Sequence, residues 1–591
     1  FRSSSSSLGN AQSAAIYLII NMIGHSSSND NLLDAYAGLL KQCGENTQKE
    51  EIYRIWNLCC SDYPLPEMTI DRDLKSLDAN YLIDNIDRSY DAWKKAPWHG
   101  QVSFDTYCQY ILPYRINTER LSTIGWRDTL SGRYYPLIRG EKNVKKAFAI
   151  INQYIIHHFR NTQPDYPRQM DALSIGKIRP GNCSLRCLYT IYVLRALGIP
   201  ACYDFVNYWS NYSTRGHSWV TLVTHPDSTF TLHKGDSLPL FHNRIDGSVF
   251  LADFLPEETY PYPLDSIKRV AQVFRYTFDK QNGEHHHEVT SQYGISRPLK
   301  MKNAPVKNGF CDISIFLTGK DWEVIKSVPV HNHRIEVESI GYDQLYLFTY
   351  RDDEGNLVRS VPAIFHSNGR LEYLRGDKRR KETVVAYRKY PLFIHQTETW
   401  CKMKGCIIEA SNSSDFENSE ILLEIKETPF LFSCHKVKPA KAYRYVRYRN
   451  TNRWATALAE FEVYGKERMK GRPIGSTYDE EVLARGVDRN YLTFVTSYGE
   501  DYWYGLDLGN KPSLIERVRF LPKNDANFIE PGHKYEMLYY DNRWISLGMH
   551  IARCDSLVYE IPANSLTLVR DLTAGKEERP FTYREHTPQW W

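Results

Sequence analysis

Cys183 is the residue of this chain best placed for nucleophilic chemistry. It follows Gly181-Asn182 and opens a predicted helix, which runs over 184–197 and ends at Gly198 and Pro200. At such a position, free backbone N–H groups and the helix dipole favour the thiolate over the thiol. A thiolate attacks the carbonyl carbon of an amide or an ester.

A histidine downstream supplies the base that such a thiol needs. His217 opens a predicted strand, 217–223, and a strand packed against the helix can present its imidazole to the sulfur. The imidazole would complete an ion pair with the thiolate and then protonate the leaving group. The backbone N–H of Cys183 would contribute to an oxyanion hole.

An acidic residue that orients the imidazole has three candidates. Asp236 follows the predicted strand 229–232, the hairpin partner of the histidine strand, and is the expected third member. Asp204, in the predicted strand 201–206, is a rival. Asp227 is another, although a Pro-Asp turn already explains it.

Three further sequence patterns have structural explanations and need no catalytic or metal-binding role. Cys187 lies one helical turn after Cys183, where core packing is the better interpretation. The run Glu284-His285-His286-His287-Glu288 follows a loop glycine, and consecutive histidines cannot all converge on one metal ion. Arg375-Gly376-Asp377, with the basic residues 378–381 after it, indicates a charged hairpin turn. We therefore predict neither a metal nor a cofactor.

The elements around these residues predict a multidomain α+β protein. An amphipathic helix over 142–159 precedes the cysteine helix, and antiparallel strands follow it. Upstream the pattern is helical, with capped helix starts at Thr69-Ile70-Asp71 and at Asp78. From about residue 301 it alternates as strands do, for example over 312–317 and 344–350. The expected domains are a helical N-terminal region (1–134), an α+β core (135–300) and two antiparallel β-sandwiches (301–430 and 431–591).

Three motifs of the core resemble those of the transglutaminase-like superfamily of papain-type thiol enzymes. They are Gly181-Asn182-Cys183, Gly198-Ile199-Pro200 and His217-Ser218-Trp219. The resemblance implies a Cys183–His217–Asp236 triad. A fourth family motif, an aromatic-x-x-Leu-Asp run, departs here, because Phe230-Thr231-Leu232-His233-Lys234-Gly235-Asp236 displaces the aspartate.

The C-terminal region, from about residue 430, resembles discoidin-type (coagulation-factor type C) domains. Residues 441–448 and 458–465 resemble one strand pair of that family, and Trp503-Tyr504-Gly505-Leu506-Asp507-Leu508-Gly509 resembles another strand. Gly486-Val487-Asp488 replaces the usual Asp-Gly. The resemblance implies a jelly-roll sandwich whose end loops often bind carbohydrate or surfaces; a packing module without a ligand is the alternative, and calcium binding stays open.

Composition restricts the partners and the compartment. A net charge of +4 over 591 residues gives no case for nucleic-acid binding. The longest apolar run, 14–20, is about half of what a membrane crossing needs. The chain begins at Phe1 rather than Met, and the serines at 3–7 resemble a tether after a removed signal. We expect membrane attachment only through such a missing N-terminal anchor.

The domain order as a whole resembles exported, tethered multidomain transglutaminase-like proteins of Gram-negative bacteria. We therefore expect a lipid-anchored extracytoplasmic enzyme, in the periplasm or at the outer-membrane surface. It would use a Cys-His-Asp triad on an amide bond of a protein, cell-wall peptide or glycan-linked substrate. Hydrolysis and acyl transfer both stay open. The alternative is a catalytically degenerate glycan- or surface-binding protein that acts through the discoidin-like domain.

Overall fold

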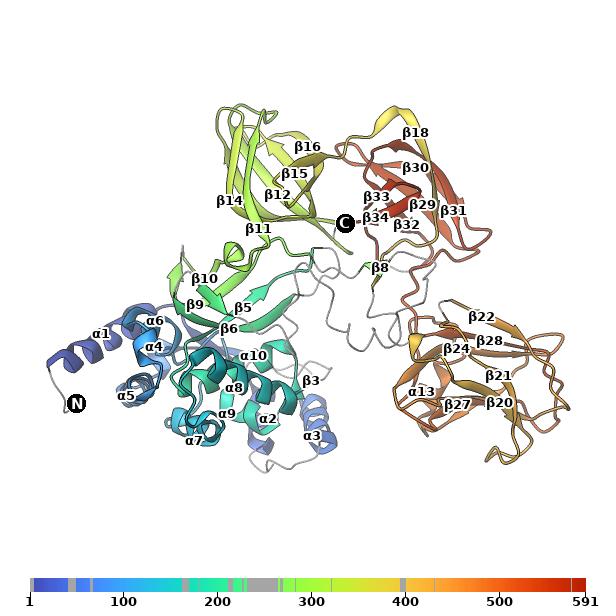
Figure 1. Cartoon of the computed structure of the whole chain (residues 1–591), viewed down its shortest axis with the longest axis horizontal. Helices are drawn as coiled ribbons and strands as arrows, with labels where there is room; N and C mark the ends of the chain where they lie inside the picture. The colour runs from blue at the N-terminus through green and yellow to red at the C-terminus, as the bar shows by residue number, and fades with distance from the viewer. Residues whose placement is uncertain are drawn as a thin grey trace. The chain divides into compact units, whose positions relative to one another are not determined.

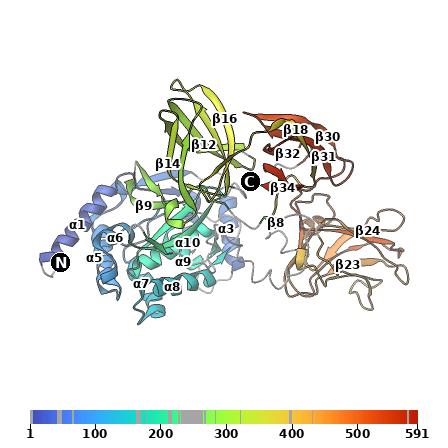
Figure 2. The ribbon, with the colours of Figure 1, turned by 45° about the horizontal axis from the view of Figure 1, so that its top comes forward.

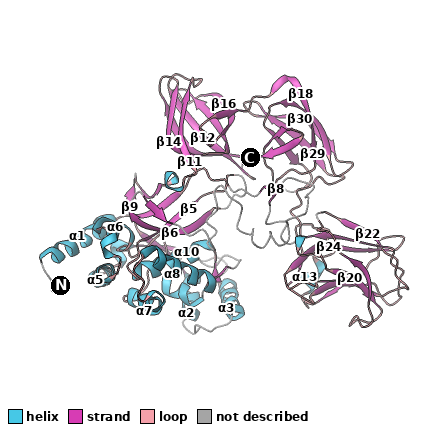
Figure 3. Ribbon diagram, viewed as in Figure 1, coloured by secondary structure: helices cyan, strands magenta, loops and turns pink. Residues whose placement is uncertain are grey.

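The protein folds into two compact units, seen here in a computed structural model. The first unit comprises Phe1–His242 and Lys268–Tyr373, and the second Asn243–Ile267 and Leu374–Trp591. Helices dominate the N-terminal part of the first unit, and strands dominate the rest of the chain (Figure 3). This mixture of helices and antiparallel sheets confirms the multidomain α+β prediction. The structure describes residues 5–40, 49–63, 67–161, 170–178, 180–210, 216–225, 228–230, 264–265, 269–281, 283–319, 321–393, 400–429, 431–574 and 577–591.

The helices of the first unit precede its main sheet along the chain (Figure 1). The helix predicted over 142–159 is α8, capped by the Asn143 side chain, and the cysteine helix is α10. Asp78 caps α5, as predicted. No helix in the described part of the chain is long and apolar enough to cross a membrane. The bounds are α1 (Ser5–Asn21), α2 (Asn31–Leu40), α3 (Lys49–Asp62), α4 (Asp73–Ser76), α5 (Ala79–Lys95), η1 (His99–Gln101), α6 (Phe104–Tyr110), α7 (Trp126–Ile138), α8 (Val144–His158), α9 (Ala172–Ile178) and α10 (Cys183–Ala196).

One predicted helix start is wrong. Thr69-Ile70-Asp71 lies in strand β2 (Met68–Arg72), which pairs antiparallel with β1 (Ser26–Asp30). The short helix α4 begins only at Asp73, whose carboxylate is buried in an ion pair with Arg115. Partners more than 40 residues away along the chain therefore decide this local structure, and a local capping pattern cannot show them.

The main sheet of the first unit has five antiparallel strands in the order β10-β9-β5-β6-β7. Two further two-residue strands, β3 (Arg160–Asn161) and β4 (Pro180–Gly181), pair parallel just before α10. The strand predicted over 201–206 is β5, and the strands predicted over 217–223 and 229–232 lie at β6 and β7. The bounds are β5 (Ala201–Val206), β6 (His217–His225), β7 (Ser228–Phe230), β9 (Phe274–Gln281) and β10 (Glu284–Glu288).

Helix α10 covers one face of this sheet. Leu185 and Ile191 of the helix join Ala201, Val220 and Leu222 of β5 and β6 in one hydrophobic cluster. A smaller hydrophobic cluster lies on the other face and includes Val206, Trp209, Trp219, Val273 and Val289. Because neighbouring residues of β6 face opposite sides of the sheet, Ser218 faces the helix and His217 does not.

A β-sandwich completes the first unit. Its two sheets have the orders β11-β14 and β13-β12-β15-β16-β17, and all their pairs are antiparallel. The strands predicted over 312–317 and 344–350 are β12 and β15, and a cluster that includes Ile313 and Phe348 fills the core. The bounds are η2 (Thr290–Tyr293), β11 (Ser296–Lys302), β12 (Gly309–Leu317), β13 (Asp321–Val330), β14 (Arg334–Gly341), β15 (Gln344–Arg351), β16 (Leu357–Phe365) and β17 (Leu371–Tyr373).

The second unit contains two hydrophobic cores, and one is inserted into the chain of the other. Strands β18 and β29 to β34 surround a core with Val384, Ile561 and Val569, while β20 to β28 surround a core with Ile408, Phe461 and Phe520. The bounds are β8 (Leu264–Asp265), β18 (Asp377–Ala386), β19 (Leu392–Phe393), β20 (Ile407–Ser411), β21 (Glu420–Glu424), β22 (Ser433–Lys436), β23 (Tyr445–Arg449), β24 (Thr456–Tyr464), β25 (Arg472–Gly475), α13 (Glu480–Ala484), β26 (Val495–Ser497), β27 (Trp503–Asp507), β28 (Arg517–Pro522), β29 (Lys534–Tyr540), β30 (Trp544–Ile551), β31 (Leu557–Ala563), β32 (Thr567–Asp571), β33 (Phe581–Arg584) and β34 (Thr587–Trp590).

Strand pairing in the second unit differs from the sequence expectation in two respects. The segments 441–448 and 458–465 do not pair: β23 lies between β20 and β27, whereas β24 lies between β28 and β26 in another sheet. Strands β23 and β24 are both labelled in Figure 2. Strands β20 and β23 are hydrogen-bonded across the boundary expected at residue 430. In each case the paired strands are distant from each other in the sequence. Turn and linker patterns do not specify such long-range pairs. The basic residues 378–381 lie in β18, where a bulge replaces the expected hairpin turn.

Candidate active site

The N-terminus of α10 carries the thiol. The Asn182 side chain accepts a hydrogen bond of 3.1 Å from the backbone N–H of Leu185, so it acts as the N-cap. Cys183 is the first residue of the helix and is half-buried. The thiol therefore lies at the positive end of a helix of 14 residues.

The N-terminal end of β6 carries the imidazole. Gly216 precedes His217 and packs closely against β5. A Cβ atom at this position would lie 2.2 Å from the Val206 carbonyl oxygen. Only glycine fits this approach. The ring of His217 lies near two indoles, with centroid distances of 5.9 Å to Trp209 and 6.1 Å to Trp219 and interplanar angles of 27° and 29°. These contacts restrict the orientation of the imidazole.

The imidazole of His217 lies close enough to the Cys183 thiol to change its pKa. Burial raises the pKa of the Cys183 thiol, but hydrogen bonds and charge from His217 oppose it. Two hydrogen bonds from Ser218, one through its side chain and one through its backbone, add to this, and the pKa is lowered to about 6. Cys183 is therefore largely ionised at neutral pH, which is the state that a nucleophile requires.

Three hydroxyl groups next to the thiol were not identified from the sequence. Ser184 Oγ lies 3.4 Å from Ser218 Oγ, and the Tyr203 hydroxyl is hydrogen-bonded to both serine side chains. Burial is the main reason why the pKa of Tyr203 is raised. In the sequence, Ser218 was visible only as the middle residue of His217-Ser218-Trp219.

Asp204, a candidate third member, is held in a buried ion pair. Its two carboxylate oxygens accept hydrogen bonds of 2.8 and 2.7 Å from Arg275, and both side chains are 0% exposed. The Tyr293 hydroxyl donates to the same carboxylate and accepts a hydrogen bond of 2.9 Å from Trp219 Nε1. Asp204 thus supports the indole that stacks on His217. Its carboxylate is already neutralised by a cation.

Asp236, the expected third member, and Asp227 lie outside the described residues. Cys187 is fully buried in the core cluster that contains α10. The histidine run forms β10, where the ring of His285 lies 4.0 Å from that of the buried His25. Within the described ranges, no group of three His, Cys, Asp or Glu side chains could hold a metal ion.

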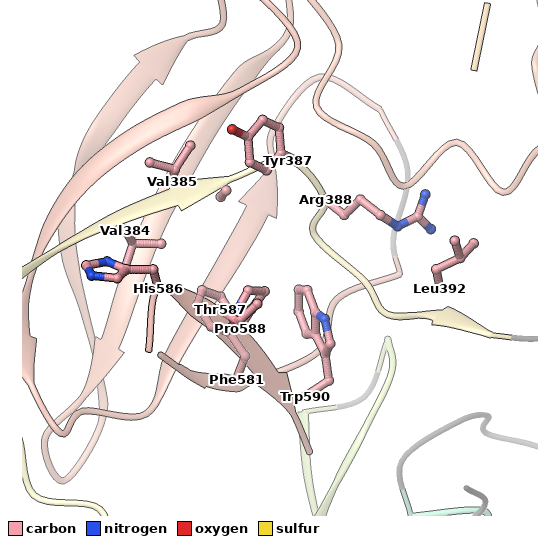
Figure 4. Close-up of a pocket in the computed structure, with 11 residues that line it drawn as sticks. Val384, Val385, Tyr387, Arg388, Leu392, Phe581, His586, Thr587, Pro588 and Trp590 are labelled. Carbon is pink, nitrogen blue, oxygen red and sulfur yellow. The ribbon is translucent and has the colours of Figure 1, made fainter. Parts of the chain in front are cut away.

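A separate cavity of about 210 Å³ lies in the second unit. It is lined by residues from the end of β18 and by the hairpin β33–β34 (Figure 4). Tyr387 and Trp590 contribute aromatic rings on different sides of it, with His586 and Thr587 as polar neighbours. Arg388 also lines the cavity, and its guanidinium is paired with Asp525. Sequence periodicity does not identify this site, because β18 and β34 are about 200 residues apart.

Comparison with known proteins identifies no relative: no protein-family model and no curated protein matches the chain.

Proposed function

We propose that the chain is a thiol-dependent amide-bond enzyme with Cys183 as nucleophile and His217 as acid–base residue. The observation that carries the proposal is the Cys183–His217 pair at the start of α10, with a thiol pKa lowered to about 6. A buried thiol without these partners would have a raised pKa instead, as Cys108 has at about 12.

The reaction would proceed in two covalent steps. The Cys183 sulfur forms a bond to the substrate carbonyl carbon, and the C–N bond breaks as His217 delivers its proton to the leaving amine. A water molecule or a second amine, deprotonated by His217, then attacks the thioester and releases the thiolate. Water gives hydrolysis and an amine gives acyl transfer. Asp236 remains the proposed third member, which would orient the imidazole.

The substrate and the compartment follow from the motifs of the sequence. The resemblance to transglutaminase-like proteins favours a protein, a cell-wall peptide or a glycan-linked peptide, with hydrolysis ahead of transfer. The same resemblance, together with the serine run at 3–7, supports a lipid-anchored position outside the cytoplasm. The discoidin-like resemblance of the last domain would add a carbohydrate site at the end loops of that domain.

Trapping of the acyl group tests the proposed function. The full chain is incubated with an activated acyl ester, p-nitrophenyl acetate, and its tryptic peptides are analysed by mass spectrometry. We expect an acetyl thioester on Cys183 and a burst of p-nitrophenol, both absent in Cys183→Ala and strongly reduced in His217→Ala. The exposed Cys434 and Cys554 are internal controls. Equal acetylation of all three cysteines would contradict the proposal.

The cavity of the second unit favours a second candidate function, which is carbohydrate binding. Aromatic rings beside polar groups are the usual lining of a site for an amphipathic ligand. Trp590→Ala should weaken binding to a glycan array if Trp590 contacts the sugar, whereas Cys183→Ala should leave it unchanged. A glycan signal that is insensitive to Trp590→Ala would place the ligand elsewhere, and no signal at all would exclude this function for the glycans tested.

A further inference from the structure

The hydroxyl groups beside Cys183 form one connected set that the two-residue mechanism does not use. Ser218 lies on β6, is 2% exposed, and has its Oγ 3.4 Å from the Oγ of Ser184, the residue after Cys183. Hydrogen bonds from its side chain and its backbone are among the causes that lower the pKa of the thiol. The Tyr203 hydroxyl, from the neighbouring strand β5, contacts Ser218 and also Ser184 of α10.

Strand geometry explains why this set faces the thiol. Tyr203 pairs with Val220, and Ser218 pairs with Phe205, so Tyr203 and Ser218 lie diagonally on the helix-facing side of two adjacent strands. The first turn of α10 brings Cys183 and Ser184 against this side. His217 faces the other side of the sheet, so Ser218, and not His217, lies on the side of α10.

We propose that Ser218 is a catalytic residue that donates a hydrogen bond to the nucleophilic sulfur, and that Tyr203 holds its hydroxyl in this orientation. This inference rests on the proposed function, because it concerns the same nucleophile. A tyrosine hydroxyl that remains protonated is a permanent donor, and burial keeps Tyr203 in that state. Ser218 receives from Tyr203 and donates to the thiolate, and successive hydrogen bonds of this kind strengthen one another.

Alkylation by iodoacetamide measures this hydrogen bond directly. The thiolate displaces iodide and forms an S–C bond, so the labelling rate at each pH reports the ionised fraction of Cys183. Among the described residues, His217 from β6 and Tyr203 from β5 are ionisable neighbours of Cys183, and Cys187 of α10 lies near Tyr203. The rate is measured on the full chain between pH 4 and 10 by peptide mass spectrometry, and thiolate absorbance at 240 nm gives a second measurement.

Ser218 and Ser184, whose hydroxyl oxygens lie 3.4 Å apart, provide a matched pair of variants. Ser218→Ala should move the midpoint of Cys183 labelling upward by about one pH unit, since a hydrogen bond to a charged group contributes about 1.5 kcal/mol or more. Ser184→Ala should move it much less, because His217 and Ser218 are the groups that chiefly lower the pKa of the thiol. Tyr203→Phe should give an intermediate shift, and Ser218→Thr, which keeps the hydroxyl, should restore the low midpoint.

The outcomes separate the inference from the proposed function. A low midpoint in the unmodified chain that Ser218→Ala leaves unchanged overturns the role of Ser218 and leaves the Cys183–His217 pair intact. An equal shift in Ser184→Ala also overturns it, since a general packing effect would then suffice. If Cys183 in the unmodified chain labels with the midpoint of the exposed Cys554, the proposed function itself fails.

Discussion

At the scale of single residues, the environment of Cys183 is a balance of opposing effects. Burial disfavours the thiolate, whereas an imidazole, a serine side chain and a backbone group favour it. The net result is a lowered pKa at this half-buried thiol. The buried Cys202 on β5 shows the opposite result: burial, with the nearby carboxylate of Asp204 adding to it, raises its pKa well above the usual value. The pKa values of these two thiols therefore differ because of their positions in the fold.

The buried Asp204–Arg275 pair gives a prediction about stability at this scale. Asp204→Asn would leave the Arg275 charge buried without its carboxylate, and should lower the free energy of unfolding by about 3–5 kcal/mol. Urea denaturation followed by circular dichroism measures this. Asp91→Asn is the control, because its ion pair with Lys95 is exposed (64% and 76%) and should contribute less than about 1 kcal/mol. Similar losses of unfolding free energy in both variants would contradict a stabilising role for the buried Asp204–Arg275 pair.

At the scale of elements, the site depends on where two elements begin, helix α10 at Cys183 and strand β6 at His217. Gly198 and the Asn182 cap define the helix by local signals, which is why the sequence predicted its bounds within a residue or two. The close approach of β6 to β5 at Gly216 is a contact between strands, and a sequence shows it only as an isolated glycine.

Gly216→Ala should displace the start of β6. Its Cβ would collide with the Val206 carbonyl at 2.2 Å, so His217 would move away from the sulfur and the low midpoint of Cys183 labelling should rise. Gly132→Ala is the control, because this glycine of α7 has no atom within 4 Å of the added carbon. That change should be neutral or stabilise by about 0.5–1 kcal/mol. A Gly216→Ala chain with an unchanged midpoint would show that the approach does not position the imidazole.

His25, which precedes β1, and His285 of β10 are in contact and make stability depend on pH. His25 and His285 both hydrogen-bond the Phe278 carbonyl oxygen, and burial, with His285 next to it, lowers the pKa of His25 to about 3. The folded state keeps His25 neutral while the unfolded state gains a proton below about 6.5, so stability falls as the pH drops from 6.5 toward 3.

His25→Gln should therefore flatten the dependence of stability on pH below 6.5. The slope removed is at most about 1.4 kcal/mol per pH unit for one proton. Urea midpoints between pH 4 and 7 measure it, and His157→Gln, at an exposed position near the end of α8, is the control. The explanation fails if the slope of His25→Gln equals that of the unmodified chain.

At the scale of the whole molecule, residues 400–523 are an insertion. They enclose one hydrophobic core, and a hydrogen bond of 2.6 Å from Trp400 Nε1 to the Lys523 carbonyl joins their two ends. Close termini are typical of inserted domains. The host core, by contrast, pairs β18 with β31 across the insertion.

The isolated segment 400–523 should fold by itself. We expect a cooperative urea transition and dispersed amide signals in nuclear magnetic resonance spectra. The segment 431–591, which follows the boundary expected from the sequence, lacks β20 and β21 and should give neither, because β23 would lose its partner β20. A folded 431–591 together with an unfolded 400–523 would contradict the insertion.

The sequence predicted the parts of the protein that local patterns specify. The start of α10 at Cys183, the start of β6 at His217 and the strands β5, β12 and β15 all depend on capping residues, turn residues or alternation. Three features depend instead on partners far along the chain: the Asp204–Arg275 pair, the Tyr203–Ser218–Ser184 contacts and the insertion at 400–523. No spacing rule connects such partners, so only the folded chain shows them.

The thiolate–imidazole pair is tested by the pH dependence of Cys183 alkylation in the unmodified chain and in His217→Ala. We expect a midpoint of about 6 for Cys183 in the unmodified chain. We also expect a midpoint above neutrality in His217→Ala, because burial would then oppose ionisation against only the weaker effects of Ser218 and the helix N-terminus. A midpoint of Cys183 that coincides with that of the exposed Cys434 and Cys554, or that does not move in His217→Ala, would contradict a thiolate–imidazole pair.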